Sequence, residues 1–71
     1  MLKNGDFVWY NLLASGRKWM GRIDHMNPHA LDGSEVVISS LHNPESMIFR
    51  LPHEVSVATE GEVVLWKLEN L

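Results

Sequence analysis

Cysteine is absent from this chain of 71 residues. Without thiols the protein has neither a disulfide framework nor a thiolate metal site, two usual means of stabilising a small domain. A domain of this size buries only about 60% of the surface of its unfolded chain, which places it near the lower limit of independent stability. We therefore expect stabilisation by a partner protein or by further copies of the chain.

Long apolar runs and an excess of basic residues are also lacking. The apolar run at residues 63–66 ends at Lys67 and is far too short to cross a membrane, and no basic segment followed by an apolar one opens the chain. We therefore expect a soluble, cytoplasmic protein with no membrane partner. The net charge of −3 is opposite in sign to that of most duplex-binding domains, which disfavours nucleic acid as a partner.

Turn-forming residues divide the sequence at intervals of about ten residues, a spacing typical of an all-β barrel or sandwich. Between the turns we predict strands at residues 6–12, 18–26, 35–41, 46–51 and 55–58, and a tight helical turn at residues 51–54. No linker or repeat interrupts the pattern, so residues 1–71 are expected to form a single domain.

Residues 59–71 fit two structures. Residues 63–66 are strand formers, and residues 59–62 suit a hairpin loop. Thr59 and Glu62, however, have the spacing of a helix capping box, and the apolar residues at positions 64, 65, 68 and 71 share one helical face. Because adjacent β-branched residues start helices poorly, we favour a last strand, with a short C-terminal helix as the alternative.

Alternation along the first strand places apolar residues on both of its faces. Val8 and Tyr10 share one face, and Phe7 and Trp9 share the other. One barrel interior cannot take both, so Phe7, Trp9 and Met20 need a cover, either the C-terminal segment or a partner. The predicted core consists of Val8, Tyr10, Leu12, Gly21, Ile23, Val37, Met47, Phe49, Leu51 and Val55.

The first third of the chain contains two linked motifs, residues 5–9 (Gly-Asp-Phe-Val-Trp) and residues 19–23 (Trp-Met-Gly-Arg-Ile). This pair resembles the opening of Src homology 3, Tudor and PWWP domains, and retroviral integrase C-terminal barrels are similar. The resemblance implies an SH3-like barrel of five or six short antiparallel strands. In histone-reading members an aromatic cage binds methylated ammonium. Trp19 matches one cage position, whereas the third predicted strand has no aromatic residue.

A second resemblance covers more of the chain. Residues 5–8, 19–23 and 39–46 are similar to the type II, plasmid-encoded dihydrofolate reductases, small barrels that assemble around a shared pore. This resemblance implies an oligomeric enzyme that binds folate and nicotinamide. That family's catalytic strand reads Val-Gln-Ile-Tyr, whereas residues 47–50 here read Met-Ile-Phe-Arg. Since the Gln and the Tyr are missing, the resemblance supports the barrel and an assembly better than it supports the reaction.

No motif in the sequence indicates catalysis or a cofactor. There is no Gly-rich phosphate loop and no serine in a nucleophile context. The four histidines are spread over separate loops and strand ends, at positions 25, 29, 42 and 53. We therefore predict no enzyme activity, no cofactor and no metal, and a function as a non-enzymatic binding module for a protein partner or as a homo-oligomer.

The predicted binding residues combine outward apolar side chains with flanking cations. They are Phe7, Trp9, Trp19, Met20, Arg22 and Arg50. Each large aromatic buried at an interface contributes about 1.5–3 kcal/mol. For Arg50, an ion pair at the rim with Glu54 or Glu35 is an equal alternative. The alternative function is a nucleic-acid-binding barrel in which Arg17, Lys18 and Arg22 contact phosphates and Trp19 stacks on a base.

Overall fold

The computed structural model describes residues 2–11 and 16–70 of the chain. Within them lie β1 (Phe7–Asn11), β2 (Lys18–Met26), β3 (Val36–Ser40), β4 (Met47–Arg50), the 3₁₀ turn η1 (Pro52–Glu54), β5 (Val55–Val57) and the helix α1 (Glu60–Asn70). The five predicted strands and the helical turn before the last of them are confirmed. Position 12, the predicted end of the first strand, lies outside the described residues.

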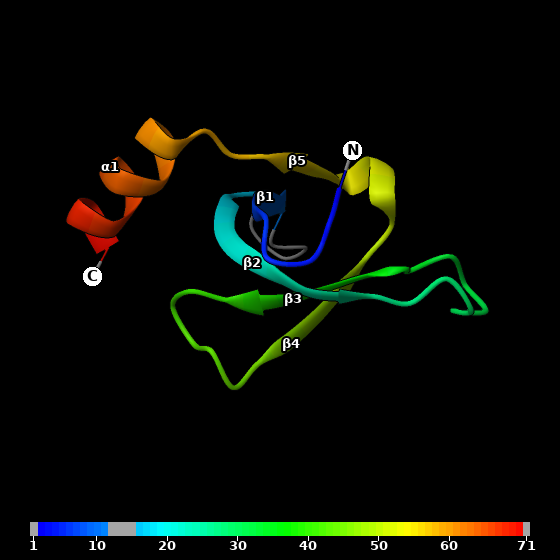
Figure 1. The fold of residues 1–71 in the computed structure, drawn as a ribbon. Coiled ribbons are helices and arrows are strands. Elements are labelled where there is room, and N and C mark those ends of the chain that lie inside the picture. Colours follow the sequence, from blue (N-terminus) through cyan, green and yellow to red (C-terminus); the bar gives the residue numbers. More distant parts are fainter. Residues whose placement is uncertain (1, 12–15, 71) are drawn as a thin grey trace.

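The strands form one antiparallel sheet in the order β4-β3-β2-β1-β5. A small, mostly β fold is therefore confirmed. β4 and β5 are the two edges of this sheet, and in the described part of the chain they do not pair, so the sheet does not close into a barrel. Figure 1 shows α1 at one end of the molecule, after β5, and the loop between β2 and β3 at the other.

The core lies on the inner side of the curled sheet, where β1, β2 and β3 face one another. Its central cluster is Val8, Tyr10, Ile23, Val36 and Ile38, and the half-buried Leu2, Trp19, Met26, Ile48 and Val55 pack against it. The predicted alternation of β1 is confirmed, because Val8 and Tyr10 are buried. Gly21 pairs with Val8 and is buried as well, which leaves room for neighbouring side chains to approach its backbone.

The predicted inward face of β4 is wrong. Met47 and Phe49 are 47% and 56% exposed, whereas Ile48 packs against the core. The cause is the register with β3, which sets Ile48 opposite the buried Ile38. Directly opposed residues of antiparallel strands share a face, so Phe49 lies on the outward face, opposite Val37.

The favoured last strand is also wrong, because residues 60–70 form the helix α1. Its start is fixed by a reciprocal capping box: the backbone N–H of Thr59 donates to Oε1 of Glu62 at 2.8 Å, and the N–H of Glu62 donates to Oγ1 of Thr59 at 3.2 Å. Trp66 is buried and anchors the helix. The cap and this anchor outweigh the weak helix propensity of the adjacent valines.

Candidate functional site

The helix α1 contacts the outward face of β1, which the sequence left uncovered. The indole Nε1 of Trp9 donates to Oε2 of Glu62 at 3.3 Å. The ammonium of Lys67 lies 5.2 Å from the centre of the Phe7 ring, within the range of a cation–π contact. Met20, beside Trp9 in the sheet, is completely buried. Of the two covers considered for this face, the C-terminal segment is the one present.

Glu62 links the start of the helix to the sheet. Its carboxylate accepts hydrogen bonds from the backbone of Thr59 and from Trp9. The N–H of Thr59 is the largest cause that lowers the pKa of Glu62; the Thr59 hydroxyl, the Trp9 indole and the charge of Lys18 act in the same direction, against partial desolvation. The folded chain therefore favours the ionised carboxylate at this junction.

Trp19 lies in a cluster of rings at the start of β2. The His42 ring stacks on it with centroids 5.1 Å apart and planes 23° apart, and Trp66 of α1 meets it edge-on at 5.6 Å. The guanidinium of Arg17 lies 5.8 Å from the Trp19 centroid. The cluster thus ties the helix and the loop after β3 to the sheet. A base that stacks on Trp19 would have to compete with His42.

The predicted cationic residues do not all share a surface with Trp19. Because side chains alternate along β2, Lys18 and Arg22 lie on the face opposite Trp19. Arg22 donates from Nε to the carbonyl oxygen of Gly5 at 3.0 Å and lies 5.3 Å from the Phe7 centroid. Lys18 borders two shallow hollows beside Trp9.

Arg50 reaches across the open side of the sheet. Its Nη2 donates to the carbonyl of Asn11 and its Nη1 to that of Phe49, both at 2.9 Å, and its guanidinium lies 5.7 Å from the Tyr10 ring centre. Among the described residues no carboxylate forms an ion pair with Arg50. Its Nε is buried and makes no hydrogen bond. Arg50 therefore links the edge strand β4 to the end of β1.

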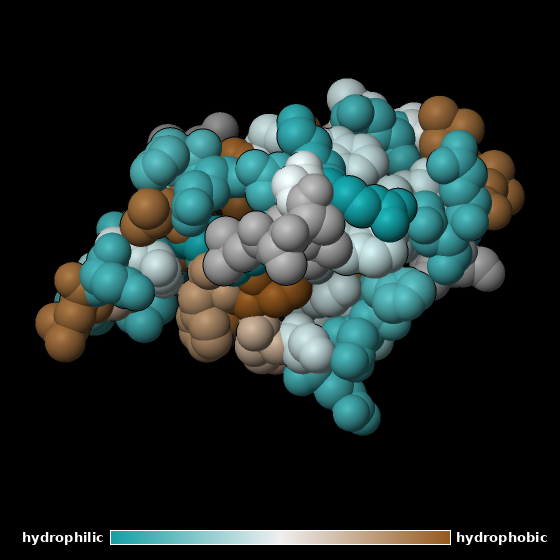
Figure 2. Space-filling view, turned by 180° about the vertical axis from the view of Figure 1, so that it is seen from behind, coloured by the Kyte–Doolittle hydropathy of each residue, from teal (hydrophilic) through white to brown (hydrophobic). Residues whose placement is uncertain are grey.

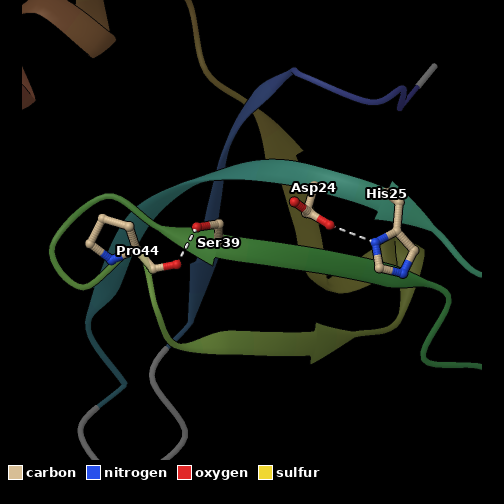
Figure 3. Close-up of polar contacts among 4 residues, drawn as sticks. All are labelled: Asp24, His25, Ser39 and Pro44. Atoms are coloured by element: carbon tan, nitrogen blue, oxygen red, sulfur yellow. Dashed lines mark hydrogen bonds and ion pairs between the residues drawn. The ribbon is translucent and has the colours of Figure 1, made fainter.

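The one close acid–histidine contact of the described residues lies on β2, where Asp24 also borders a hollow lined by residues of β2, β3 and the loop after β3. Nδ1 of His25 lies 2.7 Å from Oδ2 of Asp24, where a register shift between Ile23 and His25 brings the adjacent side chains together. Figure 3 shows that the nearby Ser39 hydroxyl points away from His25; it donates to the carbonyl of Pro44 at 3.0 Å. The three side chains therefore do not form a Ser-His-Asp triad.

The described ranges 2–11 and 16–70 hold neither a cluster of metal ligands nor a membrane-spanning helix. No group of three histidine or acidic side chains there is placed to hold a metal ion. No helix in the same ranges is long and apolar enough to cross a membrane.

Large apolar side chains remain exposed at the edges of the fold. They are Leu31, Met47, Phe49, Val57, Val64, Leu65 and Leu68. Figure 2 shows apolar atoms at both ends of the molecule, one end being the helix. The shared helical face of positions 64, 65 and 68 was visible in the sequence, but these side chains point outward, and Trp66 faces the sheet in their place.

The comparisons with known proteins give no relative. No family model matches the chain, and neither a curated protein nor a solved structure matches it. Function must therefore be inferred from the fold and the contacts described above. What these define is a small antiparallel sheet domain with a C-terminal helix.

Proposed function

We propose that this chain is a non-enzymatic interaction module that binds protein surfaces, foremost those of further copies of itself. The observation that supports this function is the apolar surface that the fold leaves uncovered on edge strand β4 and on the outer side of α1. Scattered apolar residues on a surface are ordinary, whereas groups of them on one element mark interaction sites.

In a domain of this size, the free energy of burying these exposed apolar side chains is large relative to the total stability. Fully burying one leucine or phenylalanine side chain contributes about 1.5–3 kcal/mol. The total stability of small domains is only about 5–15 kcal/mol, so covering a few such side chains changes it substantially. Binding a second surface recovers this free energy without an increase in chain length.

We propose that the framework of this module is an open SH3-like barrel. Its support is the strand order, the 3₁₀ turn directly before the short last strand, and the curled sheet with its core on the inside. Arg50 joins the edge strand β4 to the carbonyl of Asn11 at the end of β1, across the inner side of the curled sheet. In this framework the outward side chains of β4 and α1 stay available to a partner.

The test is the solution mass of the purified full chain over a wide concentration range, by sedimentation velocity. We expect the mean mass to rise with concentration and the melting temperature to rise with it. Because apolar contacts drive most of the association, raising the salt concentration should weaken it far less than it would weaken binding to phosphates. A chain that remains monomeric throughout would refute self-association. Tight oligonucleotide binding that weakens steeply with salt would instead support the nucleic-acid alternative.

A further inference from the structure

The helix α1 has apolar residues on two opposite sides. Trp66 is buried against the sheet, and Val63 and Asn70 beside it are half-buried. On the other side Leu65 is 60% exposed and Leu68 is 78% exposed, and the half-exposed Val64 lies one turn before Leu68 on the same side of the helix. These three apolar side chains form an outer stripe on which no charged residue of the described helix lies.

This stripe is held in a fixed position. A free helix of this length is marginal in water, but α1 is docked by the Thr59–Glu62 capping box, by the hydrogen bond between Trp9 and Glu62, and by the edge contact of Trp66 with Trp19. A partner therefore binds a preformed surface, and little conformational entropy of α1 is lost on binding.

The shape of the stripe is complementary to itself. Gly61 lies on the same helical side, one turn before Leu65, and a Cβ there would meet only Oγ1 of Thr59, at 4.0 Å. When two such helices run antiparallel with position 64 of one beside position 65 of the other, Gly61 of each lies opposite Leu68 of the other. The most exposed leucine of the stripe then enters the hollow left by the missing side chain.

The charges beside the stripe complement each other in the same arrangement. Glu60 and Lys67 are two helical turns apart and border the stripe on one flank. A two-fold axis brings each flank of an antiparallel pair against its own copy, so Glu60 of one chain lies near Lys67 of the other, twice. On the other flank the same register brings Glu69 of one chain near Glu62 of the other; the Glu62 carboxylate is turned to Thr59 and Trp9 of its own chain, and this flank adds no attraction.

We infer that α1 is a self-association surface, on which two copies of this chain pair their helices antiparallel about a two-fold axis. This inference rests on the proposed function and assigns its surface and its partner, a second copy. The contact of two short helices is smaller than a standard protein interface, so the dimer is expected to be weak and in rapid exchange.

The first test compares two leucine variants of the full chain by sedimentation velocity. Leu68→Lys should lower the association constant about tenfold or more, because the leucine is lost from the interface. Leu31→Lys is the matched control, since Leu31 is fully exposed on the loop after β2, and it should leave the association constant unchanged. Equal association of both variants, in a wild-type chain that does dimerise, overturns the inference and leaves the proposed function standing.

The second test uses the charged flank. Glu60→Lys alone and Lys67→Glu alone should each weaken self-association, because each places like charges opposite one another in both contacts. An equimolar mixture of the two variants should form heterodimers, since every contact then joins opposite charges. Native mass spectrometry measures the heterodimer fraction directly. A mixture with no more heterodimer than the statistical share rules out the antiparallel pairing.

Discussion

Replacing Gly21 by alanine is expected to destabilise this protein severely, although it adds a single methyl group. Gly21 lies in the centre of the sheet, paired with Val8 of β1 and Ser40 of β3. A Cβ at this position would collide with Cγ2 of Ile38, lie 2.9 Å from the carbonyl oxygen of Ser39 and lie 3.1 Å from Cε1 of Tyr10. The backbone oxygen belongs to a paired strand and cannot rotate away.

The magnitude follows from these contacts. Forcing an extra carbon into a packed core costs about 1–3 kcal/mol, and the backbone contact places Gly21→Ala at the upper end of that range. In a domain of this size each 1 kcal/mol shifts the melting temperature by about 4–8 °C. Gly61→Ala is the matched control, because a Cβ at Gly61 would meet only Oγ1 of Thr59, at an ordinary contact distance of 4.0 Å, and alanine favours the helix by up to about 1 kcal/mol.

Both variants are measured by urea and thermal denaturation, followed by far-ultraviolet circular dichroism at a concentration low enough to hold the chain monomeric. Gly21→Ala should lower the midpoint strongly, and Gly61→Ala should leave it unchanged or raise it. A Gly21→Ala midpoint within error of wild type would refute the packing described around Ile38 and Tyr10.

Three further predictions concern Glu62 and Trp66, which hold α1 to the sheet, and Arg50, which joins β4 to β1. The folded state lowers the pKa of Glu62, so its ionised carboxylate stabilises the fold above the ordinary glutamate pKa. This stabilisation is lost as the pH falls through the lowered pKa. Glu62→Gln should therefore reduce the loss of stability at acid pH, measured by urea denaturation over a range of pH values. Arg50→Met should cost about 1–2 kcal/mol in urea denaturation because it leaves the carbonyl of Asn11 without its donor, and Arg50→Lys should not restore the loss, since lysine lacks the planar fork. Trp66→Ala should cost about 3–5 kcal/mol and shift the fluorescence of Trp19 as the helix undocks.

The strands could be predicted because their sequence signals agree. Turn residues bound each strand, and the alternation of β1 separates Val8 and Tyr10, which are buried, from Phe7 and Trp9 on the opposite face. Pro52 correctly marked the turn before β5, because it fixes its own backbone and donates no hydrogen bond. The strand bounds, the alternation of β1 and the turn at Pro52 all depend on residues that are close together in the sequence.

The face of β4 and the form of the C-terminal segment depend on distant residues. In β4 both alternating sets contain apolar residues, and Arg50 seemed to mark the outer face. Its guanidinium instead reaches backbone carbonyls from the inner side and lies over the Tyr10 ring, within the range of a cation–π contact. For α1 the deciding contacts are with Trp9 and Trp19, far away in the sequence.

The candidate binding surface was harder to predict than the fold. Phe7 and Trp9 were correctly recognised as outward-facing, but the segment that contacts them belongs to the same chain. The exposed stripe of α1 appeared in the sequence as an apolar helical face, and such a pattern does not tell whether the face packs inward or outward. As binding residues Phe7, Trp9, Trp19, Met20, Arg22 and Arg50 stay predictions.

The strand order also has a consequence for the route by which the protein folds. β1 to β4 are joined to their neighbours in sequence, so each pairing closes only a short loop. β5 must return from the far end of the chain to pair with β1, and α1 can dock only after it. During synthesis four strands are available before β5 leaves the ribosome. We therefore expect the amides of β5 and α1 to lose hydrogen-exchange protection at lower denaturant concentration than those of β2 and β3.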